Sequence, residues 1–518
     1  MRRPLSRLLL FALPLWLASA LWAATPVSVD ALMAAADRRD PADPAWAAAL
    51  AQDDPVLLQV AARGLGRIGG DERLPLLLPL LAHVEPAVRA EAAFAIAILA
   101  VQAPAAQAEQ ERALALRLAL EPDSQVRQQL LRALGNCGSE HSQQLLRDYR
   151  LDGRSADERA AWAQAVGLLW SYRRGALSAL DATLVARLLS LLERDEPAAE
   201  MAAFALARAR KEPLVQAHAP ALTAAFGRAP AAGARIFLLR ALASAVTGQT
   251  ARRWLRVQQQ QRLAGRRLLA AERVELNAVL AANLPLPALR QAVALGLRSA
   301  ASAERLAILQ ALGNRPVEAQ ALRDLLQAHA ALQPADQRWL QDLLAPAQAS
   351  ADAEAETEAE ADAEPAAATP PYGQALAYVG LRYRLHTVRG AVDIELLPDA
   401  VYTAANFARL ADQGYYDRST FHRVIGNFVA QGGDPSGTGD GGPGWRIREE
   451  LSPLPHAPGY VGMATAGKDT AGSQFFINTG RNPHLDWHYT IFARVTAGQA
   501  VAQQLLPGDA LLAVRRLP

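Results

Sequence analysis

A repeated pattern over residues 44–344 constrains the fold of this chain more than any other feature. Each copy has an acidic residue followed by Pro, then an apolar residue with Arg, then Ala and Leu at helical spacing. Early copies start at Asp54, Glu85 and Glu121, a spacing of roughly 30 to 36 residues that is typical of helical repeats. Pro is tolerated where a helix begins because its missing N–H has no partner there. The pattern predicts pairs of helices stacked in a row, since one repeat cannot bury its apolar face alone.

These repeats resemble HEAT repeats. The resemblance implies an all-α solenoid of HEAT-like repeats over residues 25–345, with irregular repeats beyond Gly248. Stacked repeats expose an extended concave surface, so we expect this surface to bind a protein partner or client. A spacer that holds the C-terminal domain away from a membrane or another protein is the alternative. Delivery of that domain to one dedicated complex is a third possibility.

The N-terminal segment has the pattern of a secretory signal peptide. MRRPLSR carries positive charge, residues 8–17 are apolar but interrupted by Pro14, and Ala18-Ser19-Ala20 matches a cleavage site. The apolar run is too short for a typical membrane span. We expect residues 1–24 to be removed, leaving an exported protein without a stable membrane span, most simply periplasmic in a bacterium. An uncleaved anchor is the alternative.

Net charge and the single cysteine exclude several classes of function. The formal net charge is +2, and no basic run is interleaved with aromatic residues, so no nucleic-acid partner is expected. Cys137 is the single cysteine, and an intramolecular disulfide is therefore impossible.

Residues 346–371 form a predicted linker. Seven acidic residues alternate mostly with Ala between Asp352 and Glu364, and AAATPP follows. Like charges without an apolar period cannot build a core. We expect a flexible acidic tether.

The hydrophobic period changes after the linker, which indicates a second domain at 372–518. Residues 383–387 and 391–396 alternate as strands around an Arg389-Gly390 turn, and residues 403–413 have helical spacing. Further short strands follow, separated by Gly-rich turns. Such a pattern suggests a small closed β-barrel.

Three blocks in this domain occur in a characteristic order: FHRVIGNFVAQGGD at 421–434, GMATAGKDTAGSQFFINTG at 462–480 and HLDWHYTIFARV at 484–495. They resemble the active-site segments of the cyclophilins, which are peptidyl-prolyl cis/trans isomerases. The resemblance covers the chain from about Tyr383 onward. It implies a closed antiparallel barrel of eight strands with two helices, no cofactor and no metal, and proline-containing polypeptides as substrates.

The resemblance also implies the site residues, matched motif position by motif position. Arg423, Phe428 and Gln431 would be catalytic, with Arg423 as the cation and Gln431 orienting it or the substrate carbonyl. Phe428, Val429, Phe476 and Leu485 would line the proline pocket. Peptide-binding positions would be Gly437, Ala464, Thr465, Ala466, Gln474, His484 and Tyr489, with backbone groups offered by residues 464–466.

An arginine suits this reaction because rotation about an X-Pro bond crosses a barrier of about 18–20 kcal/mol with little covalent chemistry. In the twisted state the proline nitrogen regains a lone pair, which a fixed guanidinium can hydrogen-bond. A non-catalytic scaffold or chaperone that only binds proline peptides is the alternative function.

The chain departs from the common cyclophilin pattern near this site. Val429 stands where Met is common, Tyr489 where His is common, and His484 where the best-known relatives have Trp. Trp487 replaces the usual Gly of a turn, which predicts a reshaped rim. Val401 replaces a common Pro.

Overall fold

A computed structural model describes most of the chain. The described residues are 27–102, 107–172, 177–194, 197–229, 231–243, 269–283, 297, 299, 302–313 and 369–518. The predicted signal peptide and all but the last residues of the predicted linker lie outside this set.

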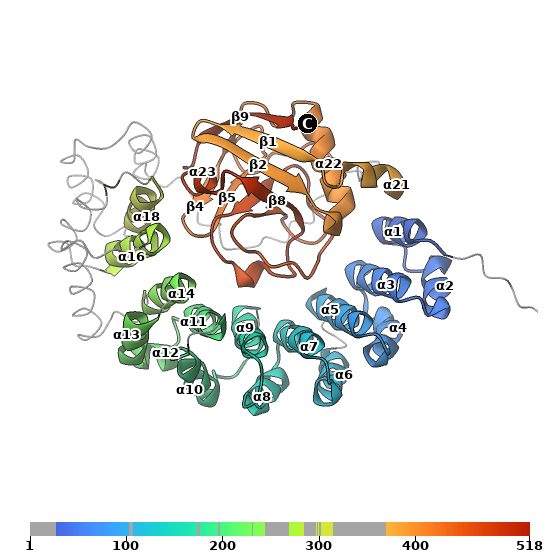
Figure 1. Cartoon of the computed structure of the whole chain (residues 1–518), viewed down its shortest axis with the longest axis horizontal. Coiled ribbons are helices and arrows are strands. Elements are labelled where there is room, and N and C mark those ends of the chain that lie inside the picture. Colours follow the sequence, from blue (N-terminus) through green and yellow to red (C-terminus); the bar gives the residue numbers. More distant parts are fainter. Residues whose placement is uncertain are drawn as a thin grey trace, which may run out of the picture.

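The N-terminal part consists of helix pairs arranged as a two-layered arc (Figure 1). The inner layer contains α1 (Val29–Arg38), α3 (Pro55–Ile68), α5 (Pro86–Gln102), α7 (Ser124–Cys137), α9 (Ala156–Tyr172), α11 (Pro197–Arg208), α14 (Ala232–Leu242), α16 (Ala270–Asn283) and α18 (Ser302–Gly313). Outside them lie α2 (Pro44–Gln52), α4 (Leu74–Leu77), α6 (Gln107–Leu120), α8 (Glu140–Asp148), α10 (Ala182–Leu191), α12 (Pro213–Ala217) and α13 (Ala219–Arg228). Each inner helix packs on the next inner helix along the chain. This arrangement agrees with the predicted helical repeats.

Ion pairs between an arginine and an acidic residue join neighbouring repeats, and one of them, Arg89 with Glu121, joins the arginine of one copy of the pattern to the acidic residue of the next. Ion pairs link Arg63 to Glu91, Arg89 to Glu121, Arg127 to Glu158, Arg235 to Glu272 and Arg273 to Glu304. Three of these arginines, Arg89, Arg127 and Arg235, also donate to backbone carbonyl groups just before their own helices, as Arg89 Nη1 does to the oxygens of His83 and Val84 at 2.8 Å. Buried charges are tolerated where such partners satisfy them. The repeated pattern therefore encodes contacts between repeats as well as helix starts.

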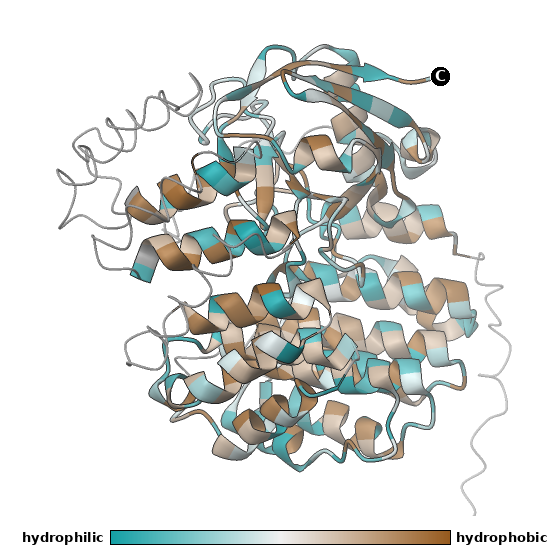
Figure 2. Cartoon of the chain, turned by 60° about the vertical axis from the view of Figure 1, so that its left-hand side comes forward, coloured by the Kyte–Doolittle hydropathy of each residue, from teal (hydrophilic) through white to brown (hydrophobic). Residues whose placement is uncertain are grey.

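Glycines permit the closest approach between inner helices. A Cβ at Gly135 would lie 2.5 Å from the carbonyl oxygen of Ala165 on α9, and a Cβ at Gly167 would lie 2.5 Å from the Phe204 ring on α11. Individual helices contain both hydrophobic and hydrophilic residues (Figure 2), as expected of amphipathic helices. No helix among the described residues is long and apolar enough to cross a membrane.

The C-terminal domain is a nearly closed antiparallel barrel. Its strands are β1 (Arg382–Thr387), β2 (Gly390–Leu396), β3 (Ser419–Phe421), β4 (Arg423–Ile425), β5 (Val429–Gly432), β6 (Tyr460–Met463), β7 (Phe475–Asn478), β8 (Ile491–Ala497) and β9 (Asp509–Arg516). Their order is β3-β9-β1-β2-β8-β6-β7-β5-β4. An isolated pairing of Thr420 in β3 with Asp434, just after β5, links one end of the sheet to the region next to its other end.

The strand count is nine rather than the predicted eight because one expected strand is divided. FHRVI forms β3 and β4, which are separated at His422. β3 pairs with β9, whereas β4 pairs with β5, so the chain changes partner at this residue. Helices α22 (Val401–Asp412) and α23 (Gln499–Ala502) complete the domain, and the short α21 (Tyr372–Ala375) contacts α1 of the arc.

The barrel lies on the concave side of the helical arc (Figure 1). Two of its side chains, Leu451 and Trp487, are 3% and 6% exposed and belong to the hydrophobic core of α1–α7. In the other direction, Leu306 of α18 joins the core of the barrel. The concave surface that we expected to receive a partner is therefore packed against the chain's own C-terminal domain.

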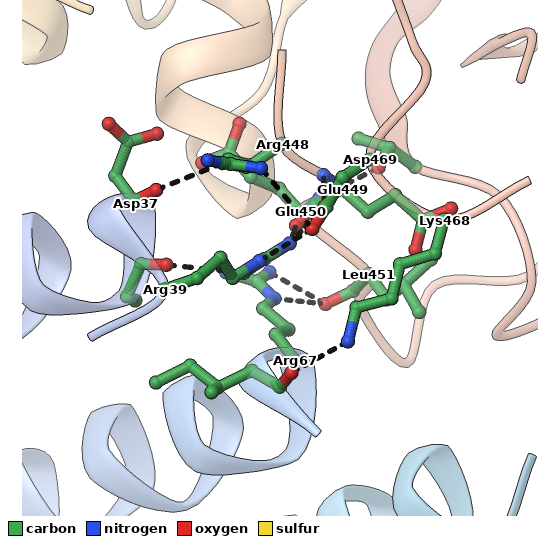
Figure 3. Close-up of polar contacts among 12 residues, drawn as sticks. Asp37, Arg39, Arg67, Arg448, Glu449, Glu450, Leu451, Lys468 and Asp469 are labelled. Carbon is green, nitrogen blue, oxygen red and sulfur yellow. Dashed lines mark hydrogen bonds and ion pairs between the residues drawn. The ribbon is translucent and has the colours of Figure 1, made fainter. Parts of the chain in front are cut away.

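Polar contacts hold the same interface near α1 and α3 (Figure 3). The buried Arg67 donates from Nε and Nη2 to the carbonyl oxygen of Leu451 at 3.0 and 2.6 Å. Arg39 donates from Nε to Asp469 at 2.9 Å and from Nη2 to the carbonyl oxygen of Glu449 at 3.1 Å. Lys468 reaches the carbonyl oxygen of Ile68 at 2.6 Å. Burial, reinforced by neighbouring positive charge, lowers the pKa of Arg67 to about 9.

Candidate active site

The β4–β5 hairpin positions the candidate catalytic arginine. Arg423 and Gln431 are directly opposite each other in the antiparallel pair, and Asn427 makes the turn with a φ of 56°. The Arg423 side chain is exposed, and its Nη1 donates to Gln431 Oε1 at 3.3 Å. The guanidinium carbon lies 5.7 Å from the centre of the Phe428 ring. A cation is thus held beside an aromatic face at the edge of the barrel.

Gln431 continues a polar network into the Gly-rich loop. Its Nε2 donates to Gln474 Oε1 at 3.1 Å, and Gln474 Nε2 donates to the carbonyl oxygens of Gly439 and Gly441 at 2.7 and 3.0 Å. Gly437 has a φ of 71°, a left-handed conformation that favours glycine. Because the Gln431 nitrogen is bonded to Gln474, the amide oxygen of Gln431 is the end that points toward Arg423.

Asp434 holds this loop in place, and the sequence analysis did not identify it. Its carboxylate accepts hydrogen bonds from the backbone N–H groups of Ser436, Gly439 and Gly441 at 2.7, 2.7 and 3.2 Å. Burial opposes ionisation, but these bonds prevail and lower the pKa of Asp434 to about 2. An Asp at the start of a Gly-rich run is a known turn signal and could have indicated this role.

An apolar cluster of side chains lies beside the arginine, on the other side of Phe428. Val429, Phe476 and Leu485 are buried together, with Phe428, Ala464 and Tyr489 packed around them. The Tyr489 ring meets the Phe476 ring edge-on at a centroid distance of 5.8 Å. Four segments distant in sequence, at 428–429, 464, 476 and 485–489, thus supply one apolar cluster, and it includes every residue assigned to the proline pocket.

His456 packs against the apolar cluster through Phe476. The sequence did not indicate this role. The His456 ring stacks on Phe476 with centroids 5.7 Å apart, and burial lowers its pKa to about 4, so it is neutral at physiological pH. Its ring nitrogens lie 3.3 Å from Asn478 Nδ2 and from the carbonyl oxygen of Tyr489. Nothing in the local sequence marks this histidine, because its partners are on other segments.

Two backbone N–H groups of the segment 464–466 are already hydrogen-bonded within the domain. Ala464 N–H donates to the carbonyl oxygen of Gln474 at 2.9 Å, and Ala466 N–H donates to Thr470 Oγ1 at 2.9 Å. Any backbone contact of Ala464 or Ala466 with a peptide would therefore use the carbonyl oxygen. The half-buried Thr465 lies between them and lines a cavity with Tyr489 and with Ile98 and Val101 of α5.

His484 lies between the barrel and the helical arc. Its imidazole is stacked between Phe428, at a centroid distance of 5.5 Å, and Phe204 of α11, at 6.5 Å. Tyr172 of α9 donates its hydroxyl to the His484 carbonyl oxygen and stacks on His488 at 4.0 Å. Burial lowers the pKa of His484 well below its ordinary value, so this ring is neutral. The sequence did not indicate that Tyr172 and Phe204 border the site, because both residues occur at the helical spacing of ordinary core residues.

Comparisons with known proteins agree on the C-terminal domain. The family model described as "Cyclophilin type peptidyl-prolyl cis-trans isomerase/CLD" matches residues 382–510. The peptidyl-prolyl cis-trans isomerase B of Bacillus subtilis is 50% identical over 24% of this chain and 89% of its own length. A peptidyl-prolyl cis-trans isomerase of Synechococcus elongatus is 44% identical over 25% of this chain and 92% of its own length.

A solved structure also resembles this domain. The crystal structure of a cyclophilin-type isomerase from Cryptosporidium parvum is 28% identical and covers 27% of this chain and 98% of its own, with a TM-score of 0.25. The identity and coverage of the Bacillus subtilis and Synechococcus elongatus relatives show that this chain belongs to the cyclophilin-type peptidyl-prolyl cis-trans isomerases.

Proposed function

We propose that Arg423 is the catalytic cation of this isomerase and that the pocket of Val429, Phe476 and Leu485 holds the proline ring. The observation that carries this proposal is the position of the guanidinium, within hydrogen-bonding distance of Gln431 and beside the Phe428 ring, which packs against the cluster of Val429, Phe476 and Leu485. An apolar pocket binds planar and twisted proline equally well, whereas a cation aimed at the nitrogen favours the twisted state. Gln431 limits the orientations of the guanidinium and so reduces the entropy lost in the transition state.

Isomerisation of a short Xaa-Pro peptide by the full chain, followed by exchange NMR, tests this role. We expect Arg423→Ala to lower kcat/KM by about 10²-fold or more, the usual effect of removing one preorganised donor. Arg423→Lys should restore only part of the rate, because an ammonium lacks the planar fork of donors. The exposed Arg409 of α22 supplies the matched control, Arg409→Ala, with an unchanged rate. Equal rates for wild type and Arg423→Ala would favour the non-catalytic scaffold.

We further propose that the substrates are exported proteins. The charged start, the short apolar run and the Ala-x-Ala site in residues 1–24 support this proposal. N-terminal sequencing of the protein from a bacterial periplasmic fraction should find a mature end near residues 21–25. Recovery of the uncleaved chain in the membrane fraction would instead support the anchor.

The helical arc, in this proposal, binds the client together with the barrel. A spacer would hold the barrel at a distance, whereas the arc packs against it and places Tyr172 and Phe204 at the margin of the site. Chemical crosslinking of the full chain to an unfolded proline-rich protein tests this role. Crosslinks to both domains are expected, and crosslinks confined to the barrel would contradict it.

A further inference from the structure

We propose that the helical arc positions the catalytic arginine by holding the β4–β5 hairpin, with Gln310 of α18 and Arg240 of α14 as positioning residues. This inference rests on the proposed catalytic role of Arg423 and deepens it by naming the groups that fix its place. The hydrogen bond from Arg423 to Gln431 measures 3.3 Å, which is longer than the usual range of about 2.7–3.2 Å. The position of the backbone that carries Arg423 therefore also decides where the guanidinium lies.

The first contact with the arc is made directly beside the arginine. β4 is the last strand in the sheet order and pairs with β5 through three residue pairs. The carbonyl oxygen of Val424, the residue that follows Arg423, accepts a hydrogen bond from Gln310 Nε2 at 2.8 Å. This bond is partly buried, so loss of the donor would leave a carbonyl group of β4 poorly satisfied. Gln310 thus ties the end strand of the sheet to α18.

The turn of the hairpin is held by a closed set of polar contacts. Arg240 Nη2 donates to the carbonyl oxygen of Asn427 at 3.0 Å, and Arg240 Nε pairs with Glu275 at 3.1 Å. The Asn427 side chain donates to the carbonyl oxygen of Ala271 at 2.8 Å and to Glu275 at 3.3 Å. The Arg240 and Glu275 side chains are 22% and 14% exposed, so salt screens them less than it screens a surface pair. Helices α14 and α16 therefore hold the turn through its main chain and its side chain.

Packing adds a third point of contact between the hairpin and the arc. A Cβ at Gly426 would lie 2.8 Å from Val274 Cγ1 of α16, so the hairpin backbone approaches this helix closely. The contacts at Val424, Gly426 and Asn427 follow Arg423 within one turn of chain. The family model matches residues 382–510, so the arc residues that make these contacts lie outside it. Displacement of a reacting group by about 1 Å can cost about 10²-fold in rate, and these contacts limit such displacement.

A double-mutant cycle in the full chain tests the proposal. Gln310→Met removes the donor to Val424 and keeps the length of the side chain. We expect kcat for a short Xaa-Pro peptide, measured by exchange NMR, to fall by about three- to tenfold, the equivalent of one hydrogen bond. KM should stay unchanged, because the contact acts on the transition state alone. In an Arg423→Ala chain, assayed at higher enzyme concentration, the same substitution should change the rate by less than about twofold. A reduction of equal size in both backgrounds would overturn the inference.

Two further variants separate positioning from a general structural effect. Gln59→Met on α3 is the matched control, since Gln59 donates to the Pro55 carbonyl oxygen of its own helix at 2.9 Å, and it should leave kcat unchanged. Arg240→Ala should lower kcat by a factor similar to that of Gln310→Met. Arg240→Lys keeps a cation beside Glu275 and should restore part of the rate.

The mobility of the arginine supplies a readout that is independent of turnover. The ¹⁵N order parameter of the Arg423 Nε–H group should fall in Gln310→Met and in Arg240→Ala and stay at the wild-type value in Gln59→Met. Wild-type kcat and an unchanged order parameter in both Gln310→Met and Arg240→Ala would overturn the inference. A wild-type chain that is no faster than Arg423→Ala would instead refute the proposed catalytic site.

Discussion

Trp487 of the barrel meets Phe94 of α5 edge to face, with ring centroids 5.0 Å apart and an interplanar angle of 90°. Trp487 has a φ of 71°, a left-handed conformation that costs a side-chain-bearing residue about 1–2 kcal/mol. A glycine would adopt this conformation without that cost. The strain is offset where the Trp487 side chain is buried in the hydrophobic core of α1–α7, so this residue favours docking of the barrel on the arc.

Replacing Trp487 with Gly should loosen the interface between the barrel and the arc. The substitution relieves the backbone strain but removes a buried indole, a loss of about 3–5 kcal/mol in comparable cores. Hydrogen exchange of α5, measured by mass spectrometry, should increase in this variant. The exposed Leu512 supplies a control, Leu512→Ala, which should leave exchange unchanged. Unaltered protection of α5 in Trp487→Gly would show that the contact contributes little.

The same interface should weaken as pH rises toward neutrality. Burial, followed by the negative charge of Asp469, raises the pKa of Glu449 to about 7, against the opposing effect of Arg39, Lys468 and Arg67. An undocked chain with the ordinary Glu pKa binds fewer protons between pH 4.5 and 7, so this contribution to stability is complete below pH 4.5 and declines up to about pH 7.

Thermal unfolding at a series of pH values tests this dependence. Glu449→Gln should remove a decline of about 1–3 kcal/mol over this interval, and the exposed Glu109→Gln should retain it. An identical pH profile for wild type and Glu449→Gln would contradict the assigned protonation. Other titrating groups cancel in the comparison, because both proteins contain them.

Close helix packing makes Gly135 intolerant of a side chain. A methyl group there would lie 2.5 Å from the Ala165 carbonyl oxygen, so Gly135→Ala should lower the free energy of unfolding by about 1–3 kcal/mol. Gly227 on α13 has open space around its added Cβ, and Gly227→Ala should stabilise the helix by about 0.5–1 kcal/mol. Urea denaturation of both variants measures the two effects. Equal stabilities would contradict the described packing of α7 on α9.

Asp434 should affect catalysis through the Gly-rich loop. Asp434→Ala leaves three buried or half-buried N–H groups without their acceptor, at a cost of about 1–3 kcal/mol. Gln474 then loses its fixed carbonyl partners, and kcat/KM should fall by less than it does in Arg423→Ala. The exposed Asp440→Asn is the control in the same peptide assay. Full activity of Asp434→Ala would show that the loop does not position Gln474.

Local sequence patterns were sufficient to predict much of this architecture. Alternation and the Arg389-Gly390 turn predicted the first hairpin, which the structure places at 382–387 and 390–396, and helical spacing predicted α22 within two residues at its start. The acidic-Pro-Arg pattern predicted the helix pairs. Of the residues matched to the cyclophilin motifs, six lie in one hydrophobic cluster: Phe428, Val429, Ala464, Phe476, Leu485 and Tyr489. Arg423 lies beside this cluster through its contact with the Phe428 ring, and it is hydrogen-bonded to Gln431.

The docking of the two domains could not be predicted from these signals. Phe94 and Trp487 are far apart in the chain, and each appears locally as an ordinary apolar residue, so neither periodicity nor a motif relates them. The roles of Phe204 and His456 could not be predicted for the same reason, because they depend on rings contributed by other segments. The divided strand at His422 likewise depends on a change of partner strand, which no local pattern records.

Small-angle X-ray scattering of the full chain is the most direct test of the central claim, that the barrel and the arc form one body with the active site at their junction. A single compact body of this length has a radius of gyration of about 24 Å. We predict a value within a few ångströms of this figure, with an increase in Trp487→Gly. A much larger radius for the wild-type protein, with the scattering profile of two separated bodies, would contradict the account.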